Sequence, residues 1–352
     1  MTVCDSVSSS IGDNCTASGY PRSILVVHNS FSRFVEIDCE LLARHCCVTV
    51  RHETSPWRLR FAQICGEVGK HDLVYCWFAS WHSLLPVLAA RFQGKPSVVV
   101  VGGYDTASVP QAAYGSQRGG VRKYLARAVM QLATHLVVNS FAARAEVVKN
   151  VGVSPEKVTV VYHGIPQRND AVQGARIRMA LTVGVISREN LLRKGLLPFV
   201  QASHLLPDVR FVHAGPVLDD SIKELYRAAS TNVEFLGRLS DEDLEALYDR
   251  ASVYVQASLH EGFGMSVAEA MAAGCIPVVS RHGSLPEVVG DTGVLLSDTT
   301  ADGVVQGIAR ALDATDAARF NAQKRVRKLF SLDQREHKLR KVLDHLIETQ
   351  RN

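Results

Sequence analysis

One stretch of the sequence combines glycines and acidic residues in a way that suits a phosphorylated or polyhydroxy ligand. It runs from Ser258 to Gly274 and places Glu261 directly before Gly262-Phe263-Gly264, with Glu269 eight residues after Glu261. It follows an apolar run and precedes a helical pattern, so unpaired N–H groups at the helix start can meet phosphate or sugar oxygens. Ser266 is expected to be the N-cap. Ser266-x-x-Glu269 also has the form of a capping box, which is the alternative role for Glu269.

Cations follow a predicted strand at 181–186. The loop from Ser187 to Gly195 contains Arg188, Arg193 and Lys194. Arginine offers a planar fork and lysine a point charge, and both bind a diphosphate well. The loop is therefore a candidate diphosphate site, and a solvated basic loop is the alternative.

Asp105 is the candidate catalytic residue in the first half of the chain, because it follows a predicted strand in the turn Gly102-Gly103-Tyr104. An Asp in such a turn can instead bind the backbone of its own loop, and the sequence leaves both roles open. His28 and His163 are further candidates to face the site, with a structural role as the alternative for each. The sequence contains no Cys-x-x-Cys pair and no histidine cluster at metal-ligand spacing, so we expect neither a metal nor another cofactor.

Two series of strands and helices must position these residues. Short continuous apolar runs are typical of strands buried on both faces. They lie at 24–27, 73–76, 98–101, 136–138 and 158–161 and, after a polar stretch, at 181–186, 210–213, 233–236, 253–255 and 276–279. Helical patterns separate them, and the end of the chain is almost entirely helical. This alternation predicts parallel α/β sheets, in which ligands bind beyond the carboxyl ends of the strands.

We therefore predict an α/β protein with two doubly wound, Rossmann-like domains facing each other across a cleft. The 352 residues fit two cores rather than one. The predicted parts are a disordered tail at 1–21, an N-terminal acceptor domain at 22–166, a linker at 167–179, a C-terminal donor domain at 180–315 and terminal helices at 316–352.

Charge is unevenly distributed. The net charge is +4, with +5 in residues 1–166 and −1 in the remainder. A basic first half suits an anionic acceptor or a membrane surface, and residues 115–127 read either as a basic membrane-surface helix or as an ordinary amphipathic core helix. The chain starts without a basic n-region and contains no apolar run of about 18 residues. We expect a cytoplasmic protein, and peripheral contact with the inner face of a membrane stays an open alternative.

Four segments taken together resemble the family 4 glycosyltransferases of the GT-B fold. They are the loop from Arg188 to Gly195, Phe235-Leu236-Gly237-Arg238, the stretch from Glu261 to Gly274, and the stretch from Ser280 to Glu287. The first domain is similar in a looser way, through residues 137–140 and His163-Gly164. The resemblance implies the GT-B fold with a terminal helix that returns to the first domain. It also implies retaining transfer of a sugar from a nucleoside-diphosphate sugar to an acceptor hydroxyl.

The resemblance also implies roles for single residues. Arg188 and Lys194 would bind the donor diphosphate, Glu269 the ribose hydroxyls and Glu261 the transferred sugar. The rest of the implied donor site comprises Phe263, Gly264, Met265, Ser266, Gly184, Gly237, Arg238 and Leu239. Two stretches depart from the family: the first strand is followed by His28-Asn29-Ser30-Phe31 instead of a Gly-rich loop, and residues 102–105 stand where many members have a histidine.

The expected partners are a nucleoside-diphosphate sugar and an acceptor that is a glycan, a lipid-linked sugar or a small molecule, with no nucleic acid. Two other functions stay open: a non-catalytic nucleotide-sugar-binding partner of another transferase, and a sugar-nucleotide epimerase on the same fold. Donor sugar, base and acceptor are left open by the sequence.

Overall fold

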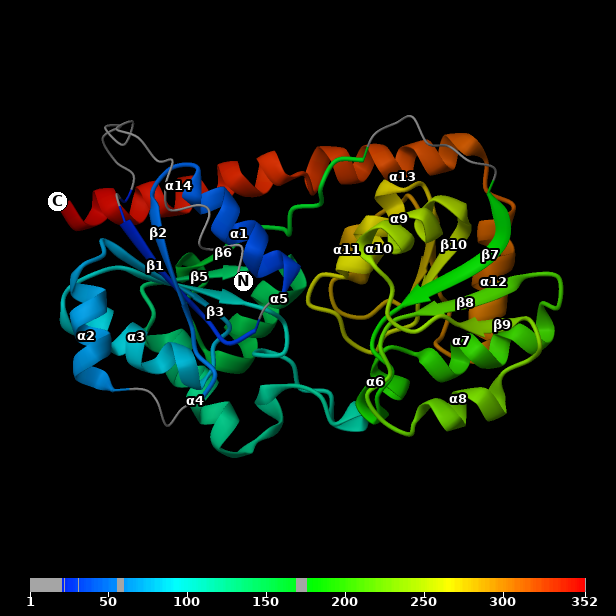
Figure 1. Ribbon diagram of the computed structural model, residues 1–352, viewed down its shortest axis with the longest axis horizontal. Helices are drawn as coiled ribbons and strands as arrows, with labels where there is room; N and C mark the ends of the chain where they lie inside the picture. Colours follow the sequence, from blue (N-terminus) through cyan, green and yellow to red (C-terminus); the bar gives the residue numbers. More distant parts are fainter. Residues whose placement is uncertain (1–20, 22, 31, 56–59, 169–175, 352) are drawn as a thin grey trace.

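The computed structural model describes residues 21, 23–30, 32–55, 60–168 and 176–351, which form two α/β domains (Figure 1). Among these residues, each domain contains one six-stranded parallel sheet. The strand orders are β2-β1-β3-β4-β5-β6 in the N-terminal domain and β12-β11-β10-β7-β8-β9 in the C-terminal domain. The prediction of two doubly wound, Rossmann-like domains is confirmed. Most of the predicted tail and linker, residues 1–20 and 169–175, lies outside the described residues.

The N-terminal sheet is built on the predicted apolar runs. Its strands are β1 (Ser23–His28), β2 (Cys47–His52), β3 (Leu73–Trp77), β4 (Ser97–Val101), β5 (His135–Val138) and β6 (Val158–Val160). The helices are α1 (Arg33–Ala43), α2 (Phe61–Gly69), α3 (Trp81–Phe92), α4 (Gly120–Leu132) and α5 (Phe141–Glu146). β3 and β4 are buried along their whole length, as continuous apolar runs predict. β2 was not predicted, because this edge strand is partly exposed and its sequence has no such run.

The C-terminal domain repeats this architecture. Its strands are β7 (Ile177–Val183), β8 (Arg210–Ala214), β9 (Val233–Phe235), β10 (Ala251–Gln256), β11 (Ile276–Val279) and β12 (Val294–Leu295). Its helices are α6 (Arg188–Arg193), α7 (Leu196–Ala202), α8 (Ile222–Ala228), α9 (Asp241–Arg250), α10 (Met265–Ala272), α11 (Leu285–Val289) and α12 (Ala301–Leu312). The side chain of Ser240 caps α9 by accepting a hydrogen bond from the N–H of Asp243.

The first strand of the C-terminal domain begins earlier than predicted. The sequence predicted a strand at 181–186, whereas β7 is Ile177–Val183 and includes the end of the predicted linker. Arg178 interrupts the apolar pattern there, but its side chain is exposed and its Nη2 lies 2.9 Å from Oδ2 of Asp208. The strand thus accommodates a polar residue at its start. Residues 184–186 become free to form a loop at the carboxyl edge of the sheet.

The last two helices, α13 (Asp316–Leu329) and α14 (Leu332–Arg351), run from the C-terminal domain back to the N-terminal one (Figure 1). Leu339 and Leu343 of α14 are buried in the same core as β1 and β3. Arg335 forms a buried pair with Asp38 of α1, with 2.5 Å between Nε and Oδ1 and 2.8 Å between Nη2 and Oδ2. The predicted return of the terminal helix is confirmed. α14 thereby links the two domains, in addition to the chain around residue 165.

Candidate active site

Glycine loops from the two domains touch where the carboxyl ends of the sheets face each other. A Cβ placed on Gly103, which follows β4, would lie 2.8 Å from the Cα of Gly262, which follows β10. A Cβ on Gly262 would lie 2.9 Å from the carbonyl oxygen of Gly102. In addition, the hydroxyl of Ser140 donates to the carbonyl of Gly262 at 2.9 Å. Side chains at these glycines would force the backbones apart, so the glycines permit this close approach of the domains.

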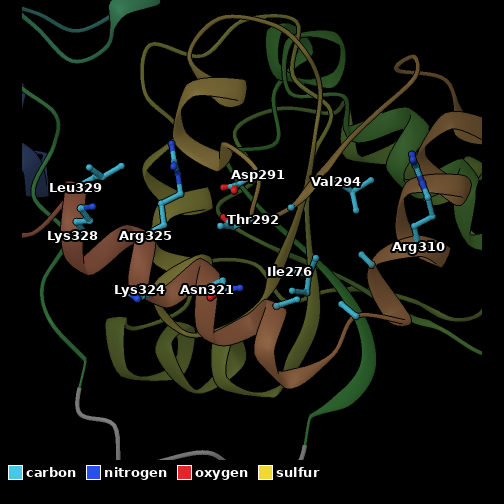
Figure 2. A pocket seen from close by; sticks show the side chains of 14 residues that line it. Ile276, Asp291, Thr292, Val294, Arg310, Asn321, Lys324, Arg325, Lys328 and Leu329 are labelled. Carbon is cyan, nitrogen blue, oxygen red and sulfur yellow. The ribbon is translucent and has the colours of Figure 1, made fainter.

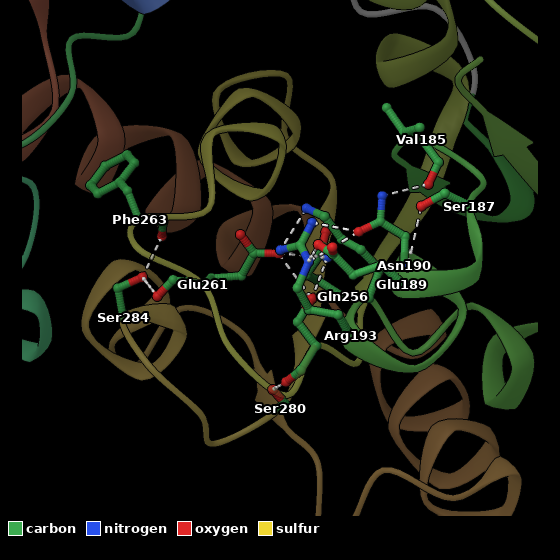
Figure 3. Close-up of polar contacts among 12 residues, drawn as sticks. Val185, Ser187, Glu189, Asn190, Arg193, Gln256, Glu261, Phe263, Ser280 and Ser284 are labelled. Carbon is green, nitrogen blue, oxygen red and sulfur yellow. Dashed lines mark hydrogen bonds and ion pairs between the residues drawn. The ribbon is translucent and has the colours of Figure 1, made fainter. Parts of the chain in front are cut away.

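The Glu261 carboxylate is held through one of its two oxygens. Its Oε1 is approached by four donors: Lys194 Nζ at 2.7 Å, Ser258 Oγ at 3.0 Å, Gln256 Nε2 at 3.2 Å and Arg193 Nη1 at 3.8 Å. Figure 3 shows Arg193 and Gln256 converging on one side of Glu261. Oε2 has no polar partner among the described residues, so this oxygen can accept a hydrogen bond from a ligand.

The environment of Glu261 favours its ionised form. Burial raises the pKa of the carboxyl group, but the charges of Lys194 and Arg193 outweigh that effect and lower the pKa below its usual value. A buried ionised carboxylate with one open oxygen is a strong acceptor for hydroxyl groups. This arrangement suits the recognition of a sugar.

The structure brings Lys194 to Glu261 but directs Arg188 elsewhere. The side chain of Arg188 is 79% exposed and its Nη1 lies 2.8 Å from Oε2 of Glu224. The sequence predicted a loop here, but residues 188–193 form helix α6. The cation beside Glu261 is the last residue of this helix, Arg193, whose Nε and Nη2 both donate to Oδ1 of Asn190. In this conformation Arg193 and Lys194 supply the positive charge around the Glu261 carboxylate, whereas Arg188 is exposed and pairs with Glu224.

The helix after the glycine loop starts differently from the prediction. α10 begins at Met265, and its N-cap is Gly264 at φ 96°, with no side-chain cap. The prediction of Ser266 as N-cap and of a capping box with Glu269 is wrong, because the positive φ of Gly264 turns the chain directly into the helix. Glu269 instead accepts a hydrogen bond from the hydroxyl of Tyr248 at 3.2 Å. Burial raises the pKa of the Glu269 carboxyl, and neighbouring acidic residues add to that effect.

The remaining predicted donor residues lie on neighbouring loops at the same edge of the sheet. A Cβ on Gly215 would be 2.0 Å from the carbonyl oxygen of Gly184, and the N–H of Gly215 donates to the carbonyl of Gly237 at 2.7 Å. A Cβ on Gly184 would meet the side chain of Lys194 at 3.8 Å. Arg238 is exposed and Leu239 packs on the core under α10. The loops after β7, β8 and β9 thus converge beside Lys194.

Phe263 is buried and joins the two domains through its ring, while Met265 and Ser266 are the first two residues of α10. Ring centroids of Phe263 and His163 are 5.2 Å apart. His163 is also stacked on Trp77, and burial lowers the pKa of its imidazole well below the usual value. His163 is therefore a neutral packing residue in this conformation, which was the alternative role for it.

The contacts of Asp105 match the structural alternative that the sequence left open. The carboxylate is buried, and its Oδ2 accepts from the N–H of Gly102 at 2.8 Å. Burial raises the pKa of Asp105 to about 6, against the opposing effect of backbone hydrogen bonds from Gly102 and Ala79. His28 is buried too, with Nδ1 3.0 Å from the carbonyl of Ser30. Both residues hold their own loops at the carboxyl edge of the N-terminal sheet.

Two family models match the chain. Residues 178–328 match the glycosyl transferases group 1, and residues 43–168 match glycosyltransferase family 4. The chain belongs to glycosyltransferase family 4. The matched ranges correspond to the C-terminal and N-terminal domains, so both halves of this glycosyltransferase carry the family's pattern.

Curated relatives and solved structures agree with this assignment. The O-antigen chain mannosyltransferase B of Escherichia coli is 34% identical over 129 residues, which is 34% of this chain and 34% of that protein. A Mycolicibacterium hassiacum MMP alpha-(1->4)-mannosyltransferase is 31% identical over 226 residues, 60% of this chain and 53% of that protein. The chain therefore aligns with only about half or less of these relatives' length.

Among solved structures, Anabaena HepE in complex with UDP-glucose superposes with a TM-score of 0.74 at 18% identity, covering 92% of this chain and 99% of that one. Sucrose-phosphate synthase from Thermosynechococcus elongatus has a TM-score of 0.72 at 17% identity, covering 93% and 100%. At these identities the likeness shows the two-domain GT-B fold alone.

Three residues at the contact between the domains were not identified from the sequence, which are Tyr114, Glu146 and His260. The ring of Tyr114 lies against the guanidinium of Arg193, with 4.5 Å from Cζ to the ring centroid. His260 Nε2 lies 2.9 Å from Oε1 of Glu146 across the domains. The adjacent positions of His260 and Glu261 were the only sequence signal for this contact, because the partners come from the other domain.

A separate hollow lies on the C-terminal domain (Figure 2). Its volume is about 620 Å³, and it lies between α12 and α13, next to β12. Its labelled lining residues are Ile276, Asp291, Thr292, Val294, Arg310, Asn321, Lys324, Arg325, Lys328 and Leu329. None of the predicted site residues lines it.

Proposed function

We propose that this glycosyltransferase moves a sugar from a nucleoside-diphosphate sugar to an acceptor hydroxyl, with retention of the anomeric configuration. The observation that carries the proposal is Glu261, an ionised carboxylate with Oε1 fixed by Lys194 and Oε2 open to a ligand. Two further points support it. Mannosyltransferases are among the relatives, and HepE, which has the same fold, has a solved structure in complex with UDP-glucose.

The donor diphosphate would lie between the cations and the start of α10. Lys194 and the N–H groups of Met265 and Ser266 supply positive potential that is already in place before the reaction. Arg188 would join them by leaving Glu224, because an exposed ion pair contributes little to stability. Glu269 would hold the ribose hydroxyls, and Gly237, Arg238 and Leu239 would lie beside the base. The proposal includes no metal and no other cofactor.

The proposed reaction breaks the bond between the anomeric carbon and the diphosphate oxygen and forms a bond to the acceptor oxygen. Attack on the face that the diphosphate leaves accounts for retention. The proton of the acceptor hydroxyl passes to the departing phosphate oxygen. Double displacement would require a carboxylate nucleophile at the sugar carbon. We propose instead that Glu261 positions the sugar through its hydroxyls, while Lys194 and α10 stabilise the leaving diphosphate.

The acceptor side offers a basic surface formed by α4 and the short turn before it, here called the α4 surface. No acidic residue occurs in residues 106–145, and Arg118, Arg122 and Lys123 surround the exposed side chains of Val121 and Tyr124. Nη1 of Arg122 lies 3.4 Å from the hydroxyl of Tyr104, next to the Gly103 contact in the cleft. In the described part of the chain, no helix is long and apolar enough to cross a membrane.

We propose that this α4 surface touches an anionic membrane that carries a lipid-linked acceptor. Co-sedimentation with vesicles of zwitterionic lipid containing about a third anionic lipid would test this. The variant that combines Arg118→Gln, Arg122→Gln and Lys123→Gln should lose binding. Absence of binding by the unmodified protein would contradict the proposal.

The test of the main proposal is release of nucleoside diphosphate from a panel of UDP-, GDP- and ADP-sugars, with and without cell-extract acceptors. Removing one preorganised cation or donor typically lowers the rate by about 10²–10³, so Lys194→Ala should bring release close to background. Glu261→Ala should do the same, because it removes the carboxylate that positions the sugar. Arg178→Ala, which removes an exposed arginine from the same domain, is the matched control.

The other two functions would give different results in this assay. A non-catalytic nucleotide-sugar-binding partner would bind one donor tightly and release no diphosphate under any condition. An epimerase would change the sugar of the donor without an acceptor and would transfer nothing. Acceptor-dependent release that requires both residues would establish the transferase and name its donor.

A further inference from the structure

Arg193 connects the acceptor domain to the Glu261 carboxylate. Its guanidinium faces the ring of Tyr114, which belongs to the N-terminal domain, with 4.5 Å between Cζ and the ring centroid. Its Nη1 lies 3.8 Å from Oε1 of Glu261, and its Nε and Nη2 are both taken up by Oδ1 of Asn190. Only 12% of the Arg193 side chain is exposed. A single planar group therefore meets the aromatic face on one side and the carboxylate at its edge.

The loop that carries Tyr114 has a fixed and unusual conformation. Val109 and Tyr114 exchange both backbone hydrogen bonds, at 2.9 and 3.1 Å, which closes a tight turn. Ala113 has a positive φ of 51°, which is uncommon for a residue with a side chain. At Gly115, with φ 100°, a Cβ would lie 2.0 Å from the carbonyl oxygen of Ala107. Strained conformations of this kind persist where the surroundings fix them, and they cluster at ligand clamps and active sites.

We propose that Arg193 is a positioning residue for Glu261, and that Tyr114 holds it in place only while the cleft is closed. The role of Glu261 in sugar binding, on which this rests, belongs to the proposed function. Arginine can stack on an aromatic ring and present N–H groups at its edge at the same time, which lysine cannot do. When the domains separate, Tyr114 leaves the guanidinium and water replaces it. The positive charge at Oε1 then depends on Lys194 alone.

A contact between the Tyr114 hydroxyl and the acceptor would be a different role for the same residue. Two substitutions separate the roles. Tyr114→Phe keeps the aromatic face and removes the hydroxyl, whereas Tyr114→Leu removes the face as well. The proposal requires Phe to substitute for Tyr, and Leu to act like Arg193→Gln. Tyr226→Leu, at an exposed tyrosine on α8 of the other domain, is the matched control.

Amide hydrogen exchange of residues 258–264, without donor or acceptor, tests the structural half of the proposal. The N–H of Leu259 donates to the carbonyl of Arg193 at 2.8 Å, so this loop reports on the seating of Arg193. Exchange should be about tenfold faster in Tyr114→Leu and Arg193→Gln, and unchanged in Tyr114→Phe and Tyr226→Leu. Equal exchange in all five proteins would overturn the proposal. This result does not depend on whether the protein transfers a sugar.

Kinetics with the identified donor test the functional half. Tyr114→Leu and Arg193→Gln should each lower kcat by about tenfold and change the donor KM by less than about threefold, and Arg193→Lys should recover little. The double variant should be no slower than Arg193→Gln, because the two residues act as one unit. Multiplying losses, or a Tyr114→Phe variant as slow as Tyr114→Leu, would overturn the proposal. Should Arg193→Gln fail to fold, Arg193→Lys replaces it in both measurements.

Discussion

The ammonium of Lys194 lies 2.7 Å from Oε1 of Glu261, and both side chains are largely buried. Lys194 follows helix α6, which comes after β7, and Glu261 lies in the loop after β10; these two strands are neighbours in the sheet. The same pair therefore fixes the Glu261 carboxylate and ties two segments of the C-terminal domain together. Its stability and its chemistry can be tested separately.

Lys194→Met should destabilise the protein by about 2–4 kcal/mol at neutral pH, because it leaves the Glu261 charge buried without its nearest partner. The remaining charge of Arg193 keeps the loss below that of an isolated buried ion. Urea unfolding is the measurement, and Lys194→Met combined with Glu261→Gln should recover most of the loss. A single variant as stable as the unmodified chain would show that the pair is not an important contact.

The pH dependence of the same contribution has a definite sign. The pKa of Glu261 is lowered in the folded protein, mainly by Lys194 and Arg193 acting against the effect of burial. Its ionised form therefore stabilises the fold above the unfolded pKa of about 4.3, and this contribution is lost as pH falls through the folded pKa. The stability advantage over Glu261→Gln should be larger at about pH 7 than at about pH 3. An advantage that grows with acidification would contradict the assignment.

Gly262→Ala should slow sugar transfer by about 10² while leaving the melting temperature nearly unchanged, because small displacements of the reacting groups already have effects of this size. The added Cβ would lie 2.9 Å from the carbonyl oxygen of Gly102 and 3.0 Å from the Cα of Gly103. It opposes the meeting of the domains rather than the folding of either one.

Gly66→Ala, in α2 with no atom within 4 Å of the new Cβ, is the control and should keep full activity. A Gly262→Ala variant with normal kcat would mean that this contact opens before the reaction.

Most of the fold could be predicted because its physical causes are local. Apolar runs such as 98–101 form strands buried on both faces. Ser240 caps α9 through a contact within its own segment, which does not depend on what the helix packs against. β7 was predicted with the wrong bounds, because Arg178 interrupts the apolar pattern at its start. β2 and β12 were not predicted, because β2 is a partly exposed edge strand and β12 has only two residues. The local signal fails where a polar residue can reach solvent from within a strand.

The site was only partly predictable, because its contacts are set by the meeting of two domains. The sequence pointed to Glu261 and Lys194 through glycine and charge patterns in their own loops. It could not show that Tyr114 contacts Arg193, or that Gly103 contacts Gly262. The two residues of each pair belong to different domains, so no local sequence pattern connects them. Ser266 was misassigned as an N-cap because the φ of Gly264 cannot be read from its type alone.

Asp105→Asn should retain most of the transfer activity, because an amide oxygen can still accept the N–H of Gly102. Asp105→Ala should lose about 1–3 kcal/mol of stability, the typical cost of an unpaired buried N–H. The measurements are kcat and urea unfolding. Loss of activity in Asp105→Asn with unchanged stability would instead restore Asp105 as a catalytic residue.

Because the pKa of Asp105 is raised, the stability difference between the unmodified chain and Asp105→Asn should depend on pH. Its folded pKa of about 6 lies above the unfolded value, so ionisation opposes folding. Stability of the unmodified chain, relative to Asp105→Asn, should fall by roughly 2 kcal/mol as pH rises from about 4 to about 7, given 1.36 kcal/mol for each pKa unit. A relative stability that stays flat over this range would show that the carboxyl is solvated.

The buried pair of Asp38 and Arg335 attaches the terminal helix α14 to the N-terminal domain. Arg335 also donates to the carbonyls of Val161 and Tyr162, so it holds α14 on α1 and on the end of the N-terminal sheet. Asp38→Ala leaves the guanidinium buried without its counter-charge and should destabilise the protein by about 3–5 kcal/mol. Arg178→Ala, which breaks an exposed pair, should change stability by less than about 1 kcal/mol.

Limited proteolysis of Asp38→Ala distinguishes detachment of α14 from unfolding of the whole N-terminal domain. Because α14 packs on the N-terminal domain through Leu339 and Leu343, its detachment should expose residues 332–350 to cleavage before either sheet unfolds. Cleavage within α14 ahead of loss of the circular dichroism signal is the expected result. Simultaneous loss of both would mean that α14 and the N-terminal sheet form one cooperative unit, and that the ion pair stabilises the whole domain rather than the attachment of the helix.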